Sequence, residues 1–235
     1  GFSQTLVSGN PLRVIQTEYF DIIFPEQSRA SAEYIASIAD DTLETLAPLL
    51  GMSPVGRIPV TISPFTDEFN GYMGFFPYAH IVLYDVAPDV EFTTYRNSLE
   101  SLFTHELVHV LSLGSRSPAM EFFHGLFGGW VMPTLLSAPL FMVEGVTVSF
   151  ESLNGYGRSN DPLVRDRLVQ ARHEGAFLSP AQASGVYDRP PFGRAYYEYG
   201  GLFSTWLQQT YGMERYALLW KELGKFSGIS LRNHP

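Results

Sequence analysis

The chain has 235 residues, a formal net charge of −9 and no cysteine. That length suits one large domain or two tightly packed subdomains, and the lack of cysteine excludes disulfides, thiolate metal sites and cysteine nucleophiles. With 15 basic against 24 acidic residues and no basic stripe along the sequence, we expect no nucleic-acid partner.

The first quarter of the chain predicts strands around a long helix. Alternating apolar residues within 11–24 predict strands that end at Pro25. Residues 27–50 carry an apolar face at helical spacing, and Gly51 follows as a helix C-cap. Residues 58–62 then predict a short strand.

Two segments before the central motif predict a turn and a strand. The run Asn70-Gly71-Tyr72-Met73-Gly74 predicts a turn or a flexible loop. Residues 79–84 predict a strand. His80 lies in that strand, where we expect a surface or cleft residue rather than a metal ligand.

A buried helix is predicted over residues 97–113, capped by Asn97 or Ser98, and it contains the run His-Glu-Leu-Val-His. A helix places His105 and His109 on one face, so both imidazoles can reach one metal ion. Glu106 is displaced sideways and can act as a general base on a water that the metal activates. The alternative is an ordinary amphipathic helix, but two histidines and a glutamate in so apolar a helix need partners, which a metal would supply.

The stretch after this helix is unusually apolar. We expect a loop over residues 114–138, and residues 122–143 contain no charged side chain. A run of that length could span a bilayer, but its glycines and prolines argue against one continuous helix. We therefore expect a buried or substrate-facing loop, with contact to a membrane surface through 122–143 as the alternative.

A second apolar helix, predicted over residues 139–153, supplies the candidate for a third ligand. Catalytic zinc takes three protein ligands, and Glu144 is a carboxylate that would be costly to bury without a partner. Glu121 and His124 in the preceding loop are rival ligands. Glu151 lies seven residues after Glu144, about 10 Å along the axis, so it cannot share the metal. We expect it to support a ligand or to lie near the surface.

The last third of the chain predicts helices. A polar break at 154–160 precedes a charged helix at 161–174, and a proline-rich stretch at 180–193 precedes helices near 195–210 and 213–225. The predicted fold class is α+β: a small mixed N-terminal sheet with helices, the histidine-bearing helix, and a helical C-terminal subdomain. We place the subdomains at 1–113 and 114–235.

The His-Glu-Leu-Val-His run and the sequence of residues 139–151, Pro-Leu-Phe-Met-Val-Glu-Gly-Val-Thr-Val-Ser-Phe-Glu, resemble the gluzincin metallopeptidases. Phe141 and Met142 replace the usual Trp-Leu, Thr147 replaces an alanine, and the gap before Glu144 is longer than in classical members. The Gly-x-Met-Glu-Asn motif of the aminopeptidase branch is missing, which argues against aminopeptidase activity.

The likeness is greater to the bacterial peptidase-MA-like domains, over about residues 15–225. Those domains share an Asn-Gly before an edge strand, here Asn70-Gly71, and an apolar segment that ends in proline before the Glu-Gly helix. They also share a late Tyr-x-Tyr-Gly-Gly-x-Phe stretch, here residues 197–203.

The resemblance implies a zincin-like fold that holds one Zn²⁺ on His105, His109 and Glu144, with Glu106 as general base. It also implies a tyrosine or histidine that stabilises the oxyanion. Tyr197 and Tyr199 are the candidates, with Tyr196 and His173 behind them. In zinc peptidases an edge strand beside the active-site helix often pairs with the substrate backbone. We assign that part to residues 79–84, with substrate contacts at Ile81, Val82 and Leu83.

The function expected from these features is a zinc-dependent metallopeptidase, an endopeptidase acting on peptide or protein substrates. The alternative is a catalytically weak module on a peptidase scaffold, which binds peptides or docks to the membrane or another envelope component. The family likeness places the protein in the bacterial cell envelope or periplasm, with the cytoplasm left open. We also expect the chain to be part of a longer protein with further domains.

Overall fold

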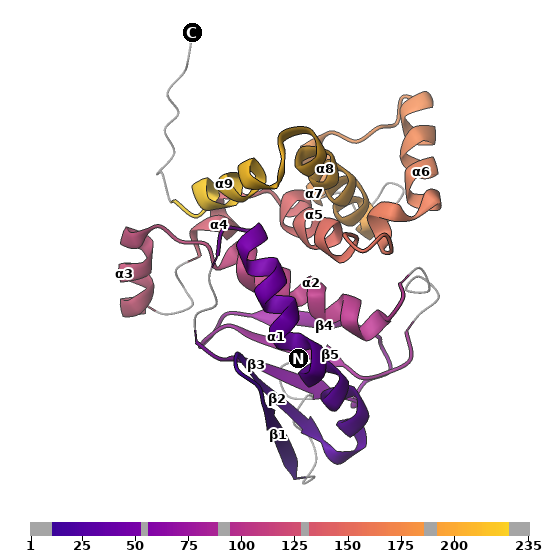
Figure 1. Cartoon of the computed structure of the whole chain (residues 1–235). Helices are drawn as coiled ribbons and strands as arrows, with labels where there is room; N and C mark the ends of the chain where they lie inside the picture. Colours follow the sequence, from indigo (N-terminus) through magenta and orange to yellow (C-terminus); the bar gives the residue numbers. More distant parts are fainter. Residues whose placement is uncertain (1–10, 53–55, 89–94, 128–131, 186–191, 226–235) are drawn as a thin grey trace.

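The computed structural model describes residues 11–52, 56–88, 95–127, 132–185 and 192–225. They form an N-terminal sheet followed by a largely helical part (Figure 1), which confirms the α+β class. The strands are β1 (Leu12–Gln16), β2 (Phe20–Pro25), β3 (Ile58–Ser63), β4 (Gly71–Gly74) and β5 (His80–Tyr84). The longer helices are α1 (Arg29–Leu49), α2 (Ser98–Leu113), α3 (Pro118–Phe127), α5 (Leu140–Glu151), α6 (Pro162–His173), α8 (Ala195–Tyr211) and α9 (Met213–Leu223). Shorter helical segments are η1 (Glu26–Ser28), α4 (Pro133–Ser137), η4 (Arg158–Asn160), α7 (Pro180–Gly185) and η5 (Phe192–Arg194).

The sheet is mixed, as predicted, with the strand order β1-β2-β3-β5-β4. The three inner strands β2, β3 and β5 are parallel, and the outer strands β1 and β4 are antiparallel to their neighbours. The predicted turn at Asn70–Gly74 is wrong, because Gly71–Gly74 forms β4 and pairs with β5. A four-residue strand that begins and ends with glycine carries a turn signal in its sequence, which is why it was missed.

Residues 79–84 contain a strand, β5, as predicted, but the prediction that this strand is an edge strand is wrong. β5 lies between β3 and β4, and Ile81 and Val82 each have a partner on both sides. Leu83 is likewise paired with Ile62 and with Gly71. The backbone of these residues is therefore engaged within the sheet, and β4 is the outer strand on this side of the described sheet.

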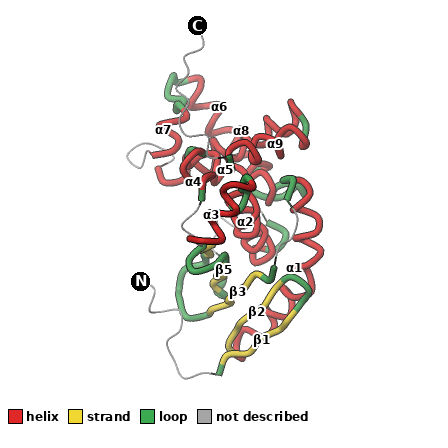
Figure 2. Tube along the Cα trace, turned by 90° about the vertical axis from the view of Figure 1, so that its left-hand side faces the viewer, coloured by secondary structure: helices red, strands yellow, loops and turns green. Residues whose placement is uncertain are grey.

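One face of the sheet is covered by α1 and α2, which pack beside each other (Figures 1 and 2). Alternate residues of the inner strands point into this layer, because side chains alternate across a strand. They are fully or almost fully buried: Phe20, Ile22, Phe24, Val60, Ile62, Ile81 and Leu83. Phe103 of α2 meets Phe20 edge to face at 5.6 Å between ring centroids, so the sheet fixes the position of α2.

The predicted cap of α2 is confirmed at Asn97, whose side chain accepts a hydrogen bond from the Glu100 amide at 3.1 Å. α2 packs on β4 and β5 on one side and on α5 on the other. Most of its residues are therefore buried, including His105, Glu106 and His109.

The segment 114–138 is not the single loop that we predicted. It contains α3 and α4, and residues 128–131 lie outside the described part. Pro133 occupies the first turn of α4, where a missing amide hydrogen costs nothing. α3 exposes Phe122, Phe123, Leu126 and Phe127. Within the described ranges, no helix combines the length and the apolarity needed to cross a bilayer.

The helical part is built on the close packing of α5 against α8. Gly145 of α5 meets Gly200 of α8, and a Cβ on either residue would collide with the backbone of the other helix. Tyr216 and Trp220 of α9 join the same buried cluster as the sheet residues. A subdomain boundary between residues 113 and 114 stays a prediction.

Candidate metal centre

Two histidines from α2 and one glutamate from α5 converge at the interface of these helices. The Nε2 atoms of His105 and His109 lie 3.5 Å and 3.2 Å from the same oxygen, Oε2 of Glu144. One ligand atom from each of the three residues lies within 4.8 Å of the others. The structure thus brings together the three residues predicted as metal ligands.

The three side chains fit a zinc ion in number and type, and the distances from Glu144 to the two histidines fit its spacing. Two imidazoles and one carboxylate form a known catalytic zinc set. Bonds of about 2.0–2.1 Å in a tetrahedron place neighbouring ligand atoms about 3.3–3.4 Å apart. The two measured nitrogen-to-oxygen distances, 3.5 Å and 3.2 Å, lie close to that value. Neither distance requires the helices to move to admit an ion.

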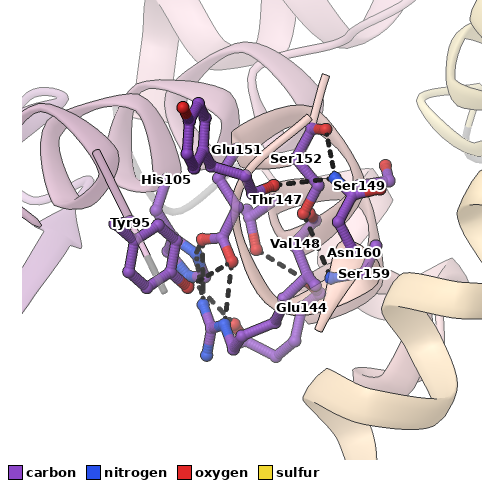
Figure 3. A network of polar contacts seen from close by, with 12 residues as sticks. Tyr95, His105, Glu144, Thr147, Val148, Ser149, Glu151, Ser152, Ser159 and Asn160 are labelled. Carbon is purple, nitrogen blue, oxygen red and sulfur yellow. Dashed lines mark hydrogen bonds and ion pairs between the residues drawn. The ribbon is translucent and has the colours of Figure 1, made fainter. Parts of the chain in front are cut away.

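Glu151 contacts His105 at the ring nitrogen that does not face Glu144 (Figure 3). Its Oε2 lies 3.0 Å from Nδ1 of His105. When Nε2 of His105 offers its lone pair to a metal, Nδ1 carries the proton and donates it to this carboxylate. Glu151 is buried and also accepts a hydrogen bond from the hydroxyl of Tyr95 at 2.7 Å. It therefore contacts one of the predicted ligands, which is one of the two positions that the sequence left open for it.

Arg158 completes this support, and sequence reasoning missed it. Its Nε and Nη2 donate to the two oxygens of Glu151 at 2.8 Å and 2.9 Å. Its guanidinium carbon also lies 4.4 Å from the ring centroid of Tyr197. The residue stands directly after Gly157, whose φ of 86° is a backbone conformation that favours glycine. The sequence showed only one cationic residue in the polar break at 154–160. No periodic pattern there indicated which way its side chain points.

Neighbouring groups stabilise the ionised form of two buried carboxylates. Burial alone would raise the pKa of Glu151, but Arg158 and His105 hold it down at about 2. Burial opposes ionisation of Glu144 as well, yet His109 and His105 keep its pKa well below the ordinary value. Both carboxylates are thus anionic at neutral pH, which suits a site for a cation.

His109 is less well supported than His105. Its Nε2 faces Glu144, but its buried Nδ1 has no hydrogen-bond partner among the described residues. The two histidines therefore differ in the contacts that hold their rings.

A cavity of about 410 Å³ opens over the three residues. Ser101, His105, His109 and Leu113 line it at intervals of four residues, so it follows one face of α2 along its length. Glu106, Glu144 and Arg158 line the same cavity, as do the β4 residues Gly71, Tyr72 and Met73. The predicted general base thus faces the same space as the predicted ligands.

The structure separates the two tyrosine candidates. Tyr197 lines the cavity, with its ring centroid 6.0 Å from that of His105. Burial and the charge of Glu144 raise its pKa above the ordinary value, so the phenol stays protonated. Tyr199 does not line the cavity, and its hydroxyl accepts a hydrogen bond from the Leu178 amide at 3.4 Å. This position does not fit the role predicted for Tyr199.

The other candidates also lie apart from the three residues. Tyr196 packs against the Tyr197 ring at 4.5 Å between centroids, and His173 is exposed at the end of α6. The rival ligands Glu121 and His124 sit on α3, outside both the metal cluster and its cavity. His80 contacts the carbonyl of Tyr78 through Nδ1 at 2.9 Å and is not part of the cluster.

Comparison with known proteins gives a relative of unknown function and a distant structural neighbour. No model of a protein family matches the chain. An uncharacterized protein of Treponema pallidum (strain Nichols) is 37% identical over 212 residues, which is 88% of this chain and 19% of that protein. The chain thus spans about a fifth of the relative's length. The crystal structure of an aminopeptidase N family protein from Idiomarina loihiensis matches with a TM-score of 0.49 and 15% identity, over 91% of this chain and 40% of the other. A likeness that weak carries no functional argument.

Proposed function

We propose that this protein is a zinc-dependent metallopeptidase of the gluzincin type. The observation that carries the proposal is the convergence of His105 and His109 on one oxygen of Glu144, at 3.5 Å and 3.2 Å. Glu106 lies in the same cavity, next in sequence to the first histidine. Two ligands, a base and a third ligand from the facing helix are the parts that this chemistry needs.

Each part of the site has a task in peptide hydrolysis. Zinc held by His105, His109 and Glu144 would polarise the scissile carbonyl and acidify a water. Glu106 then accepts a proton from the attacking water and delivers it to the leaving amine. The phenol of Tyr197 donates a hydrogen bond to the oxyanion that develops on the carbonyl oxygen. Glu151 and Arg158 keep the ring of His105 in place throughout.

The substrate backbone pairs with β4 in this proposal, not with β5. β4 is the outer strand and three of its residues line the cavity, whereas β5 is enclosed by its neighbours. An extended peptide added to a free strand edge gains main-chain hydrogen bonds without regard to sequence. The correction therefore moves the substrate contacts from Ile81, Val82 and Leu83 to Gly71–Gly74.

The cavity favours cleavage within a chain. From Ser101 to Leu113 it follows twelve residues of α2, about 18 Å of helix axis. An extended peptide rises about 3.4 Å per residue, so about five residues fit along that length. The metal ligands lie in the middle of this stretch, which leaves room for substrate on both sides of the scissile bond. A location in the bacterial cell envelope is part of the proposal and rests on the sequence likeness alone.

Replacement of the general base tests the proposal. Glu106→Gln should keep the zinc content of the wild type and lose turnover of a quenched peptide library, because the amide cannot accept the proton. Glu100→Gln is the matched control, since Glu100 lies on the same helix outside the cavity and bonds to Tyr34. Wild-type rates in the Glu106→Gln variant would refute the mechanism.

A further inference from the structure

The geometry points to a substrate preference: the peptide places a bulky apolar side chain against a wall formed by α4 and the start of α5. This inference rests on the proposed function and adds the class of peptide that the same cavity takes. The wall is formed by Met132, Leu135, Leu140 and Val143, all of which line the metal cavity.

The two ends of the cavity differ in chemistry. α5 runs antiparallel to α2, because Glu151 contacts His105 whereas Glu144, seven residues earlier, contacts both histidines and lies nearer to His109. The N-terminal end of α2 therefore faces the polar lining side chains: Tyr95, Ser101, Glu151, Arg158 and Tyr197. Leu140, one turn before Glu144, therefore lies toward the other end of the cavity, where α2 ends at Leu113.

α4 closes the apolar end from the side. It packs against α2, and the Thr134 hydroxyl donates to the carbonyl of Ser115, two residues after α2 ends, at 3.2 Å. The described lining residues contributed by residues 113–143 are all apolar and uncharged. Peptide side chains that are polar would lose water there without gaining a partner.

The wall is open enough to accept a ligand group. The relative exposure is 50% for Leu135 and 38% for Leu140, although both line the cavity. Both leucines are thus partly accessible to solvent, and the apolar surface that they form belongs to the cavity over the candidate metal centre. An apolar substrate side chain within two residues of the scissile bond would reach it, since the cavity holds about five extended residues.

Two neighbouring leucines of α4 provide the test. Leu135 lines the cavity, whereas Leu136 is 77% exposed and does not. With the wild-type zinc protein, a peptide library should show leucine or phenylalanine enriched on one constant side of the cleaved bond. Leu135→Ser should lower the ratio of kcat/KM for such a peptide to kcat/KM for its glycine analogue roughly 10- to 100-fold. That is the range expected for lost apolar contacts in a pocket. Leu135→Met should restore most of the preference, and Leu136→Ser should leave it unchanged.

A binding measurement separates this inference from the peptidase proposal. The probes are two hydroxamates that carry a leucine side chain on either side of the zinc-binding group, each with a glycine analogue. One leucine compound should bind the wild-type zinc protein more tightly than its analogue, and Leu135→Ser should abolish the difference. Tight, selective binding without hydrolysis would refute only the proposed activity. Hydrolysis or binding with no apolar preference, or equal effects of Leu135→Ser and Leu136→Ser, would overturn the inference alone.

The same variants test whether lipid is the occupant instead. In flotation with vesicles of phosphatidylcholine and phosphatidylglycerol, we expect no binding of the wild-type protein that depends on the α4 leucines. Flotation of the wild type with vesicles, reduced alike by Leu135→Ser and Leu136→Ser, would assign this wall to a membrane surface and overturn the substrate preference.

Discussion

Arg158 donates hydrogen bonds to both oxygens of Glu151, and its guanidinium carbon lies 4.4 Å from the ring centroid of Tyr197. One side chain thus links the carboxylate that orients His105 to the phenol proposed to bind the oxyanion. A planar guanidinium can donate hydrogen bonds in its plane and stack on an aromatic ring through its face at the same time. A lysine ammonium cannot do both.

Arg158→Lys should therefore impair catalysis and metal retention together. We expect kcat to fall at least tenfold and zinc affinity to fall several-fold, with a modest change in KM. Arg167→Lys is the matched control, because Arg167 pairs with the buried Glu198 at 2.6 Å outside the cavity. Steady-state kinetics and zinc titration of both variants provide the check. Equal effects of the two changes would show that the link from Arg158 to Tyr197 has no catalytic role.

Removal of the Tyr197 hydroxyl should cost transition-state stabilisation alone. Tyr197→Phe should lower kcat about 10²- to 10³-fold, the loss typical of one oxyanion donor, and leave zinc content unchanged. Tyr199→Phe should retain activity, because that hydroxyl accepts from the Leu178 amide away from the cavity. If kcat drops in Tyr199→Phe and not in Tyr197→Phe, the two roles have been assigned the wrong way round.

The carboxylate behind His105 should set metal affinity. Glu151→Gln removes the charge that accepts the His105 Nδ1 proton, and such a change typically weakens metal binding 10- to 100-fold. Tyr95→Phe removes one hydrogen bond to the same carboxylate and should have a smaller effect in the same direction. The measurement is competition with a chelator at fixed pH, and an unaltered dissociation constant in Glu151→Gln would rule out this support.

The close contact of α5 with α8 should be sensitive to a single methyl group. Gly145→Ala would push a Cβ into the backbone of Gly200 and displace α5, which carries Glu144. We expect a loss of about 1–3 kcal/mol in the free energy of unfolding and weaker zinc binding. Gly125→Ala is the control, because a Cβ there meets no atom within 4 Å. Thermal and chemical denaturation with equal stability for both variants would contradict the packing described here.

Local signals in the sequence were enough to find the three residues that converge in the candidate metal centre. The histidine spacing and the Asn97 cap are encoded within one helix, so they could be read without tertiary information. Glu144 could be found because a carboxylate in an otherwise apolar helix needs a partner. The α+β class followed from the order of strand and helix patterns.

The errors arose where distant segments determine the structure. β4 looked like a turn, because Asn70, Gly71 and Gly74 favour turns locally and only pairing with β5 makes the segment a strand. That mistake made β5 appear to be the edge. Arg158 was missed because its role depends on Glu151 and Tyr197, two residues on different helices. α3 and α4 were missed because their glycines and prolines obscured short helical patterns.

Zinc titration of two glutamate variants tests the central claim most directly. The wild type and Glu121→Ala should each bind one zinc ion with the same affinity, since Glu121 lies on α3 outside the cluster. Glu144→Ala should bind zinc at least 100-fold more weakly, because only two imidazoles remain to hold the ion. Full stoichiometric zinc at wild-type affinity in Glu144→Ala would contradict the account.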